Sequence, residues 1–140
     1  MQKTFEIQSE TELEQVADFI LKSFPDERVF LFYGDLGSGK TTLIKFLCKK
    51  LNCESQLSSP TYAIINEYQL QDKKLIYHAD LYRLKNLEEA LDIGIEEYLE
   101  SGMYFFIEWP EVIEKLLVNS TIKIEIATEN YIRLITVKKT

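Results

Sequence analysis

Cysteine, histidine and basic residues are scarce in this 140-residue sequence, and each scarcity excludes a class of protein. Two cysteines (Cys48 and Cys53) and one histidine (His78) are too few for a disulfide scaffold or a Cys/His metal centre. The 16 Lys and Arg residues are outnumbered by 23 Asp and Glu residues, which gives a net charge of −7. Because nucleic acids and anionic membranes attract basic surfaces, we expect no unaided binding to either.

Long apolar runs are also absent. The longest, at residues 103–107, is far too short to span a bilayer, and the first ten residues have no apolar core, so we expect neither a membrane segment nor a signal peptide. With 46% hydrophobic and 28% charged residues, the composition is typical of a globular protein. The sequence thus predicts a single domain spanning residues 1–140 of a cytoplasmic protein.

A glycine-rich motif stands out against this ordinary composition. Residues 34–41 (GDLGSGKT) match the phosphate-binding pattern G-x-x-x-x-G-K-[ST] in full. Glycines such as Gly37 and Gly39 let the backbone curl so that its N–H groups, with that of Ser38, point at phosphate oxygens. The Lys40 ammonium then reaches the outer phosphates and the Thr41 hydroxyl binds Mg²⁺. The motif predicts that the chain binds a nucleoside triphosphate, with Mg²⁺ beside it.

Apolar periodicity around this motif predicts an α/β fold. Dense apolar runs at residues 28–33 and 103–108 are typical of buried strands. Helical spacing begins at Ser9, where Ser9 and Glu12 form a potential capping box, and continues to about residue 24. Further helices are expected at residues 41–51, at residues 87–98 with an interruption at Gly94, and from Pro110; further strands are expected at residues 3–8, 61–70, 74–81, 121–127 and 131–137. We predict a P-loop NTPase-like three-layer fold with a mixed parallel and antiparallel central sheet, and leave the strand order open.

Two carboxylates are candidates for the metal side of the site. Asp80 ends the segment LIYHAD, and Glu108 ends the segment MYFFIE. The second segment is unbroken and apolar, as expected of a central strand, whereas the first follows a predicted hairpin and should lie nearer an edge. We therefore prefer Glu108 for Mg²⁺ and assign Asp80 to orienting the attacking water, with the reverse assignment left open.

Four motifs together resemble the bacterial TsaE family, also called YjeE: GDLGSGKTT, SPTY at residues 59–62, HADLYR at residues 78–83 and IEWPE at residues 107–111. The resemblance implies a small ATPase in the biosynthesis of threonylcarbamoyladenosine, a modified base beside the tRNA anticodon. It implies TsaD and TsaB as partners, with tRNA reached indirectly through their complex, and ATP hydrolysis that resets this complex between turnovers.

The resemblance also implies roles for individual residues. Lys40 and the loop bind phosphates, Thr41 and Glu108 hold Mg²⁺, Thr42 contacts the α-phosphate, and Asp80 supports hydrolysis. Thr11 would contact the nucleotide near its base or sugar, and Thr61 would lie in a switch-like loop. Arg83 is a candidate for stabilising phosphate charge, and Trp109, beside the metal carboxylate, for stacking on a base or partner.

Other classes of function were compared with this one. A small-molecule kinase is disfavoured because the chain has three arginines and little length for a lid, and a GTPase because no N-K-x-D motif follows the glycine-rich loop. A nucleotide-loaded adaptor, whose bound state rather than its turnover acts on a partner, is the stronger alternative, because a bare domain of this kind should hydrolyse ATP slowly.

Overall fold

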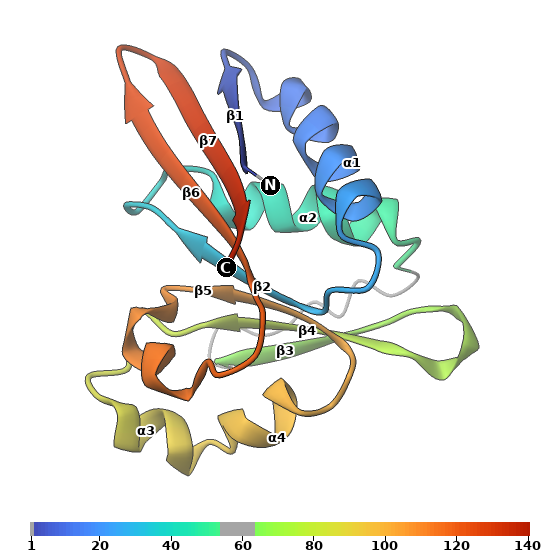
Figure 1. Cartoon of the computed structure of the whole chain (residues 1–140), viewed down its shortest axis with the longest axis vertical. Helices are drawn as coiled ribbons and strands as arrows, with labels where there is room; N and C mark the ends of the chain where they lie inside the picture. Colours follow the sequence, from blue (N-terminus) through green and yellow to red (C-terminus); the bar gives the residue numbers. More distant parts are fainter. Residues whose placement is uncertain (1, 54–63) are drawn as a thin grey trace.

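The computed structural model describes residues 2–53 and 64–140, and a seven-stranded sheet runs through it in the order β1-β7-β6-β2-β5-β4-β3 (Figure 1). The strands are β1 (Gln2–Ile7), β2 (Val29–Tyr33), β3 (Ile65–Gln69), β4 (Leu75–Asp80), β5 (Tyr104–Glu108), β6 (Ile122–Glu129) and β7 (Ile132–Lys139). The helices are α1 (Leu13–Ser23), α2 (Lys40–Lys50), α3 (Leu87–Asp92) and α4 (Ile95–Leu99). The predicted switch-like Thr61 lies outside the described residues.

Strand direction changes from the centre of the sheet to its edges. The pairs β4–β5, β5–β2 and β2–β6 are parallel, whereas β3–β4, β6–β7 and β1–β7 are antiparallel. The central strands β2 and β5 carry apolar residues on both faces, and Phe30, Leu31 and Phe32 are fully buried. The mixed sheet confirms the predicted fold class, and β5 is central while β4 lies one strand from the edge, as expected.

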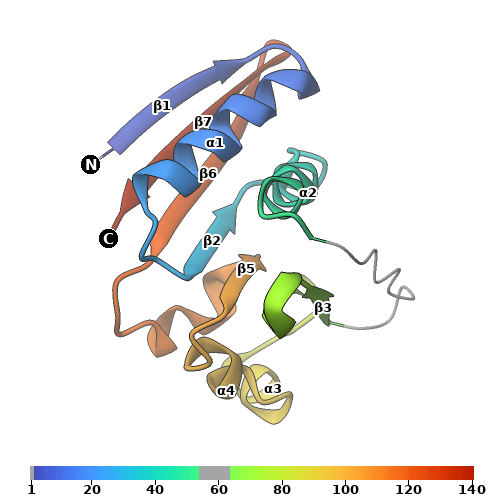
Figure 2. The same ribbon diagram turned by 90° about the vertical axis from the view of Figure 1, so that its right-hand side faces the viewer.

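Helices cover both faces of the sheet, which gives three layers. Figure 2 shows α1 and α2 on one side, and α3 and α4 on the other. Alternate residues of β2 serve the two sides: Phe30 and Phe32 pack in the core under α1 and α2, whereas Leu31 packs with Ala90 and Ile95 of the opposite layer. Burial of alternate side chains therefore fixes the register of β2 and the position at which it ends.

Three helix boundaries test the sequence interpretation. The expected capping box is wrong in detail: a 3-10 turn, η1 (Glu10–Glu12), precedes α1, and within the described residues the Ser9 side chain caps no backbone N–H. Instead the Glu12 carboxylate accepts from the Gln8 N–H (3.4 Å) and the Ser9 hydroxyl (3.4 Å). Gly94 separates α3 from α4 as predicted, at a left-handed φ of 80°. The helix that begins at Pro110 is the 3-10 helix η3 (Pro110–Leu116).

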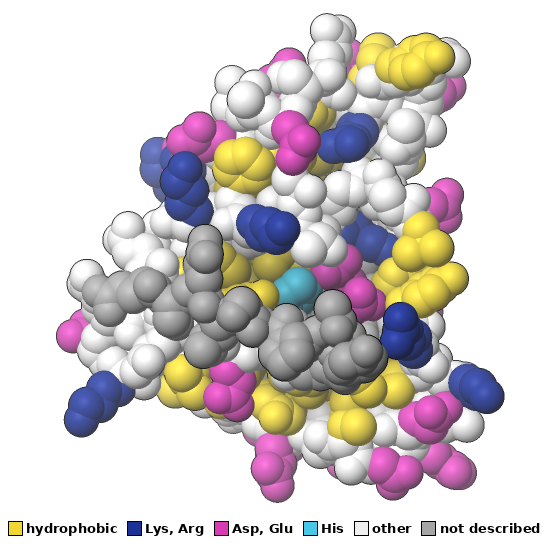
Figure 3. Space-filling model, turned by 180° about the vertical axis from the view of Figure 1, so that it is seen from behind, with side chains coloured by type: hydrophobic (Ala, Val, Ile, Leu, Met, Phe, Trp, Pro, Cys, Tyr) yellow, Lys and Arg dark blue, Asp and Glu magenta, His cyan; other side chains and the backbone are white. Residues whose placement is uncertain are grey.

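The described residues include no helix that is long and apolar enough to cross a membrane. On the face seen in Figure 3, acidic and basic side chains are interspersed, and the single histidine lies between hydrophobic side chains on one side and acidic side chains on the other.

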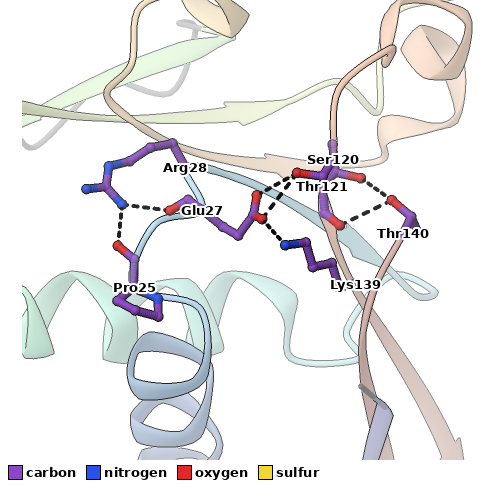
Figure 4. Close-up of polar contacts among 7 residues, drawn as sticks. All are labelled: Pro25, Glu27, Arg28, Ser120, Thr121, Lys139 and Thr140. Atoms are coloured by element: carbon purple, nitrogen blue, oxygen red, sulfur yellow. Dashed lines mark hydrogen bonds and ion pairs between the residues drawn. The ribbon is translucent and has the colours of Figure 1, made fainter.

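A group of hydrogen bonds and an ion pair lies at the end of the sheet where β2 starts (Figure 4). The Glu27 carboxylate, just before β2, accepts from the Ser120 hydroxyl (3.1 Å) and pairs with the Lys139 ammonium (2.7 Å). The Thr121 and Thr140 hydroxyls bond to each other at 2.9 Å. These contacts connect the segment before β2 to the beginning of β6 and the end of β7.

Candidate functional site

The glycine-rich loop connects the end of β2 at Tyr33 to the start of α2 at Lys40. Gly37 (φ 77°) and Gly39 (φ 108°) adopt left-handed backbone conformations that side chains disfavour. A Cβ on Gly34 would lie 2.7 Å from the Ser38 hydroxyl oxygen and 2.8 Å from the Ile126 carbonyl oxygen, so β6 leaves room there for glycine alone. The glycines of the motif are thus required by the backbone path, as the sequence predicts.

The first turn of α2 faces a cavity of about 240 Å³. The Leu43 N–H donates to the Gly39 carbonyl (2.9 Å), which is the first hydrogen bond of the helix. The N–H groups of residues 40–42 come before it and therefore have no acceptor within the helix. Together with the helix dipole, such free N–H groups favour an anion. The described residues lining the cavity are Glu10, Leu36, Gly37, Ser38, Gly39, Lys40, Thr41, Thr42, Asp80, Glu108, Trp109 and Arg133.

Glu108 is the carboxylate that the structure brings to the loop. It ends β5, is 3% exposed, and its two oxygens each accept the Thr41 hydroxyl at 2.9 Å. His78 Nε2 lies 2.6 Å from Glu108 Oε2. Asp80 stands beside Glu108 in the register of β4 and β5, but it is exposed and accepts the Tyr82 N–H at 3.1 Å. The structure therefore brings Glu108, and not Asp80, into contact with Thr41, and the assignment of the metal to Glu108 stays a prediction.

Contacts with the protein itself hold the Lys40 side chain inside the site. Its side chain is almost completely buried, its ammonium donates to the Gly34 carbonyl (2.5 Å), and it lies 3.6 Å from the centre of the Trp109 ring. Burial lowers the pKa of Lys40, while the nearby carboxylates of Glu108 and Asp80 act in the opposite direction. The indole ring therefore covers the ammonium of the lysine in the glycine-rich motif.

Two predicted residues lie outside the cavity. Thr11 is exposed in η1 and its hydroxyl contacts that of Ser9 (3.1 Å), whereas its neighbour Glu10 lines the cavity. Arg83 is exposed beyond the end of β4 and does not line the cavity. Their predicted nucleotide roles stay predictions, because the described geometry does not bring either residue to the loop.

Arg133 of β7 lines the cavity although the sequence did not predict it, as is also true of Glu10. Its Nη1 atom lies 3.0 Å from the position that a Cβ on Gly39 would occupy. It also lines a second cavity of about 120 Å³, together with Ile7, Gln8, Ser9, Glu10 and Tyr131. Alternation predicts that residue 133 lies in a strand, but no spacing relates it to the loop. Only the sheet order, which places β7 two strands from β2, brings it there.

These features define an α/β protein with a P-loop NTPase-like fold. A similar solved structure is the crystal structure of YdiB from Bacillus subtilis, which matches at a TM-score of 0.73 and 27% identity and covers 98% of this chain and 84% of that chain.

The sequence comparisons narrow the class to one family. Residues 7–135 match the family model described as "Threonylcarbamoyl adenosine biosynthesis protein TsaE". The chain belongs to the TsaE family. The tRNA threonylcarbamoyladenosine biosynthesis protein TsaE of Haemophilus influenzae is 34% identical, over 81% of this chain and 72% of that protein. Proteins of the same name from Rickettsia conorii (36% identical, 91% and 73% covered) and Borreliella burgdorferi (37% identical, 76% and 77% covered) also match. The family therefore acts in the biosynthesis of this tRNA modification.

Proposed function

We propose that this protein binds ATP with Mg²⁺ in the cavity above α2 and hydrolyses it in support of threonylcarbamoyladenosine formation on tRNA. The observation that carries the proposal is the contact between Thr41 and Glu108. It joins the phosphate-type loop to a buried carboxylate at the end of the adjacent parallel strand. P-loop enzymes use this pair of groups to hold the metal of a metal–nucleotide complex.

The residues present fit a nucleotide polyphosphate. The free N–H groups of Lys40, Thr41 and Thr42 and the helix dipole supply an anion site. The Ser38 hydroxyl is buried and has no hydrogen-bond partner among the described residues, so the loop holds a donor that it leaves unused. Among the described residues lining the cavity, Lys40 and Arg133 carry positive charge. Lys40 would bind the outer phosphates, and Arg133 would contact the nucleotide on the β7 side.

The donor set also fits Mg²⁺ held mainly by phosphates and water. No group of three or more His, Cys, Asp or Glu side chains among residues 2–53 and 64–140 could hold a metal ion without such help. Mg²⁺ usually keeps several waters and uses one or two protein ligands in phosphate sites. Because the Thr41 hydroxyl donates its hydrogen bond to Glu108, its oxygen lone pairs remain available to the metal. Bound Mg²⁺ would neutralise charge on the phosphates.

Hydrolysis would depend on Asp80 and on partners. Asp80 lines the cavity next to Glu108, where its carboxylate can orient a water toward the terminal phosphate. The two cationic side chains named above are few for stabilising the transition state of phosphoryl transfer, so turnover by the protein alone should be slow. We propose that the TsaB–TsaD complex stimulates turnover and is reset by it, and that tRNA is reached through this complex. Family membership supports this pathway.

Steady-state ATP hydrolysis tests the proposal. The purified protein is assayed alone and with the matching TsaB and TsaD proteins, using Lys40→Ala as the variant and Lys45→Ala, an exposed lysine on the same helix, as the control. We expect slow turnover alone, strong stimulation by the partners, and loss of both in Lys40→Ala only. Nucleotide binding without stimulated turnover would contradict the ATPase role and favour the nucleotide-loaded adaptor. Turnover that required a small-molecule acceptor would favour a kinase.

A further inference from the structure

His78 is a buried polar residue that the proposed function does not use. It lies on β4, two residues before Asp80, and is 7% exposed. Its Nε2 atom lies 2.6 Å from Glu108 Oε2, the shortest contact that the structure gives this carboxylate among the described residues. The imidazole ring stacks on Tyr68 of β3, with ring centres 6.3 Å apart. His78 is therefore held between the edge strand and the metal-side carboxylate.

The contact fixes which ring nitrogen carries the proton. A lone pair on Nε2 would repel a carboxylate oxygen at 2.6 Å, so Nε2 must donate to Glu108. The other nitrogen, Nδ1, is buried and has no hydrogen-bond partner among the described residues. A buried lone pair without a donor costs less than a buried N–H without an acceptor. Both ends of the ring therefore favour a proton on Nε2.

The donors around Glu108 are arranged unequally. Oε2 accepts from both His78 and Thr41, whereas Oε1 accepts from Thr41 alone. Donors on two sides fix the plane of the carboxylate, and Oε1 keeps the larger unused acceptor capacity. Donors behind a ligating carboxylate commonly orient it and tune its affinity for metal. Oε1 is thus the oxygen left for Mg²⁺ or a water bound to it.

We propose that His78 is a positioning residue that orients the Glu108 carboxylate for the metal, so that it sets the Mg²⁺ affinity of the nucleotide complex. This inference rests on the proposed function, because it needs a metal–nucleotide complex in the cavity. His78 touches neither nucleotide nor metal in this role. Its effect should appear in metal binding and not in the metal-free affinity for nucleotide.

Two substitutions separate positioning from simple packing. His78→Phe keeps an aromatic ring beside Tyr68 but removes the donor, whereas the amide of His78→Gln places an N–H close to the position of Nε2. With ADP at saturation, free Mn²⁺ is followed by its electron paramagnetic resonance signal as a probe of the metal site. Metal-free ADP affinity is measured in EDTA from Trp109, the single tryptophan, by fluorescence.

We expect His78→Phe to weaken Mn²⁺ binding about tenfold or more, with ADP affinity in EDTA unchanged, and His78→Gln to recover most of the loss. Unchanged Mn²⁺ affinity in His78→Phe, or equal losses in EDTA and with metal, would overturn the inference. If His78→Phe does not fold, the test rests on His78→Gln alone. The inference then requires that His78→Gln bind Mn²⁺ about as tightly as the wild type. Failure of the proposed function looks different: the wild-type protein would bind no ADP, or Lys40→Ala would bind it equally well.

Discussion

Replacing Thr41 with valine removes the hydrogen bond that joins α2 to β5 and leaves the shape of the side chain unchanged. The hydroxyl donates to both oxygens of Glu108 at 2.9 Å; that carboxylate is 3% exposed, whereas Thr41 itself is exposed, so water reaches the contact from one side only. Hydrogen bonds to charged groups contribute about 1.5–3 kcal/mol. We therefore expect Thr41→Val to lower the free energy of unfolding by about 2 kcal/mol without any ligand.

Thermal unfolding followed by circular dichroism measures this loss. For a domain of this size, about 2 kcal/mol corresponds to a fall in Tm of roughly 6 °C in EDTA without nucleotide. Thr41→Ser keeps the hydroxyl and is the matched control, with a Tm near that of the wild type. Addition of Mg²⁺ and ADP should then raise the Tm of the wild type more than that of Thr41→Val, because the variant also lacks the hydroxyl proposed to bind the metal.

Either of two results would refute this reasoning. If Thr41→Val melted with the wild type in EDTA, the contact with Glu108 would contribute no stability. If Mg²⁺ and ADP raised the Tm of both proteins equally, Thr41 would not be a metal ligand, although its hydrogen bond could still be structural.

Two further outcomes are expected elsewhere in the molecule. Arg133→Ala should weaken ADP binding about tenfold, because a charge-assisted contact of 1.5 kcal/mol or more is lost. Lys138→Ala, on the same strand but paired with Glu125, should bind like the wild type in calorimetric titrations, and equal affinity of both variants would remove Arg133 from the site. Burial raises the pKa of the Cys48 thiol to about 12, so iodoacetamide should label it slowly at pH 8 in folded protein, as read by mass spectrometry. Because the folded state then binds more protons, the free energy of unfolding should fall as pH rises from the ordinary thiol pKa of about 9 toward 12. In Cys48→Ala this fall with pH should be smaller. An equal fall in the variant and the wild type would contradict the assignment to Cys48.

Much of the fold follows from local patterns in the sequence. The dense apolar run at β5 predicts a strand buried on both faces, and the turn between β3 and β4 predicts their antiparallel pairing, as found. Strand order could not be predicted, because the pairing of β2 with β6 joins residues that are far apart in sequence. The first turn of the helix after Ser9 was not predicted correctly: the Glu12 N–H donates to the Ser9 carbonyl (3.1 Å), which makes a 3-10 turn, and the Ser9 side chain does not cap the helix.

The residues of the candidate site also divide into those that local sequence predicts and those that only the tertiary structure brings together. The loop from Gly34 to Thr41 and the carboxylate of Glu108 were predictable, because each lies at the end of a recognisable buried strand. Arg133 and Glu10 were not, since they reach the cavity at the glycine-rich loop only through the tertiary placement of β7 and η1. The contact of His78 with Glu108 is likewise a product of register between β4 and β5.

The place of β2 in the sheet has a consequence for how the chain is made. Both neighbours of β2, the strands β5 and β6, come much later in the sequence, and β7, which carries Arg133, follows them. While the ribosome is still translating β5, the glycine-rich loop has emerged without the strands that fix its position. Non-local pairing of this kind slows folding and leaves apolar strands exposed meanwhile. A ligand of the proposed nucleotide cavity would therefore stabilise this domain only after nearly the whole of it has been synthesised.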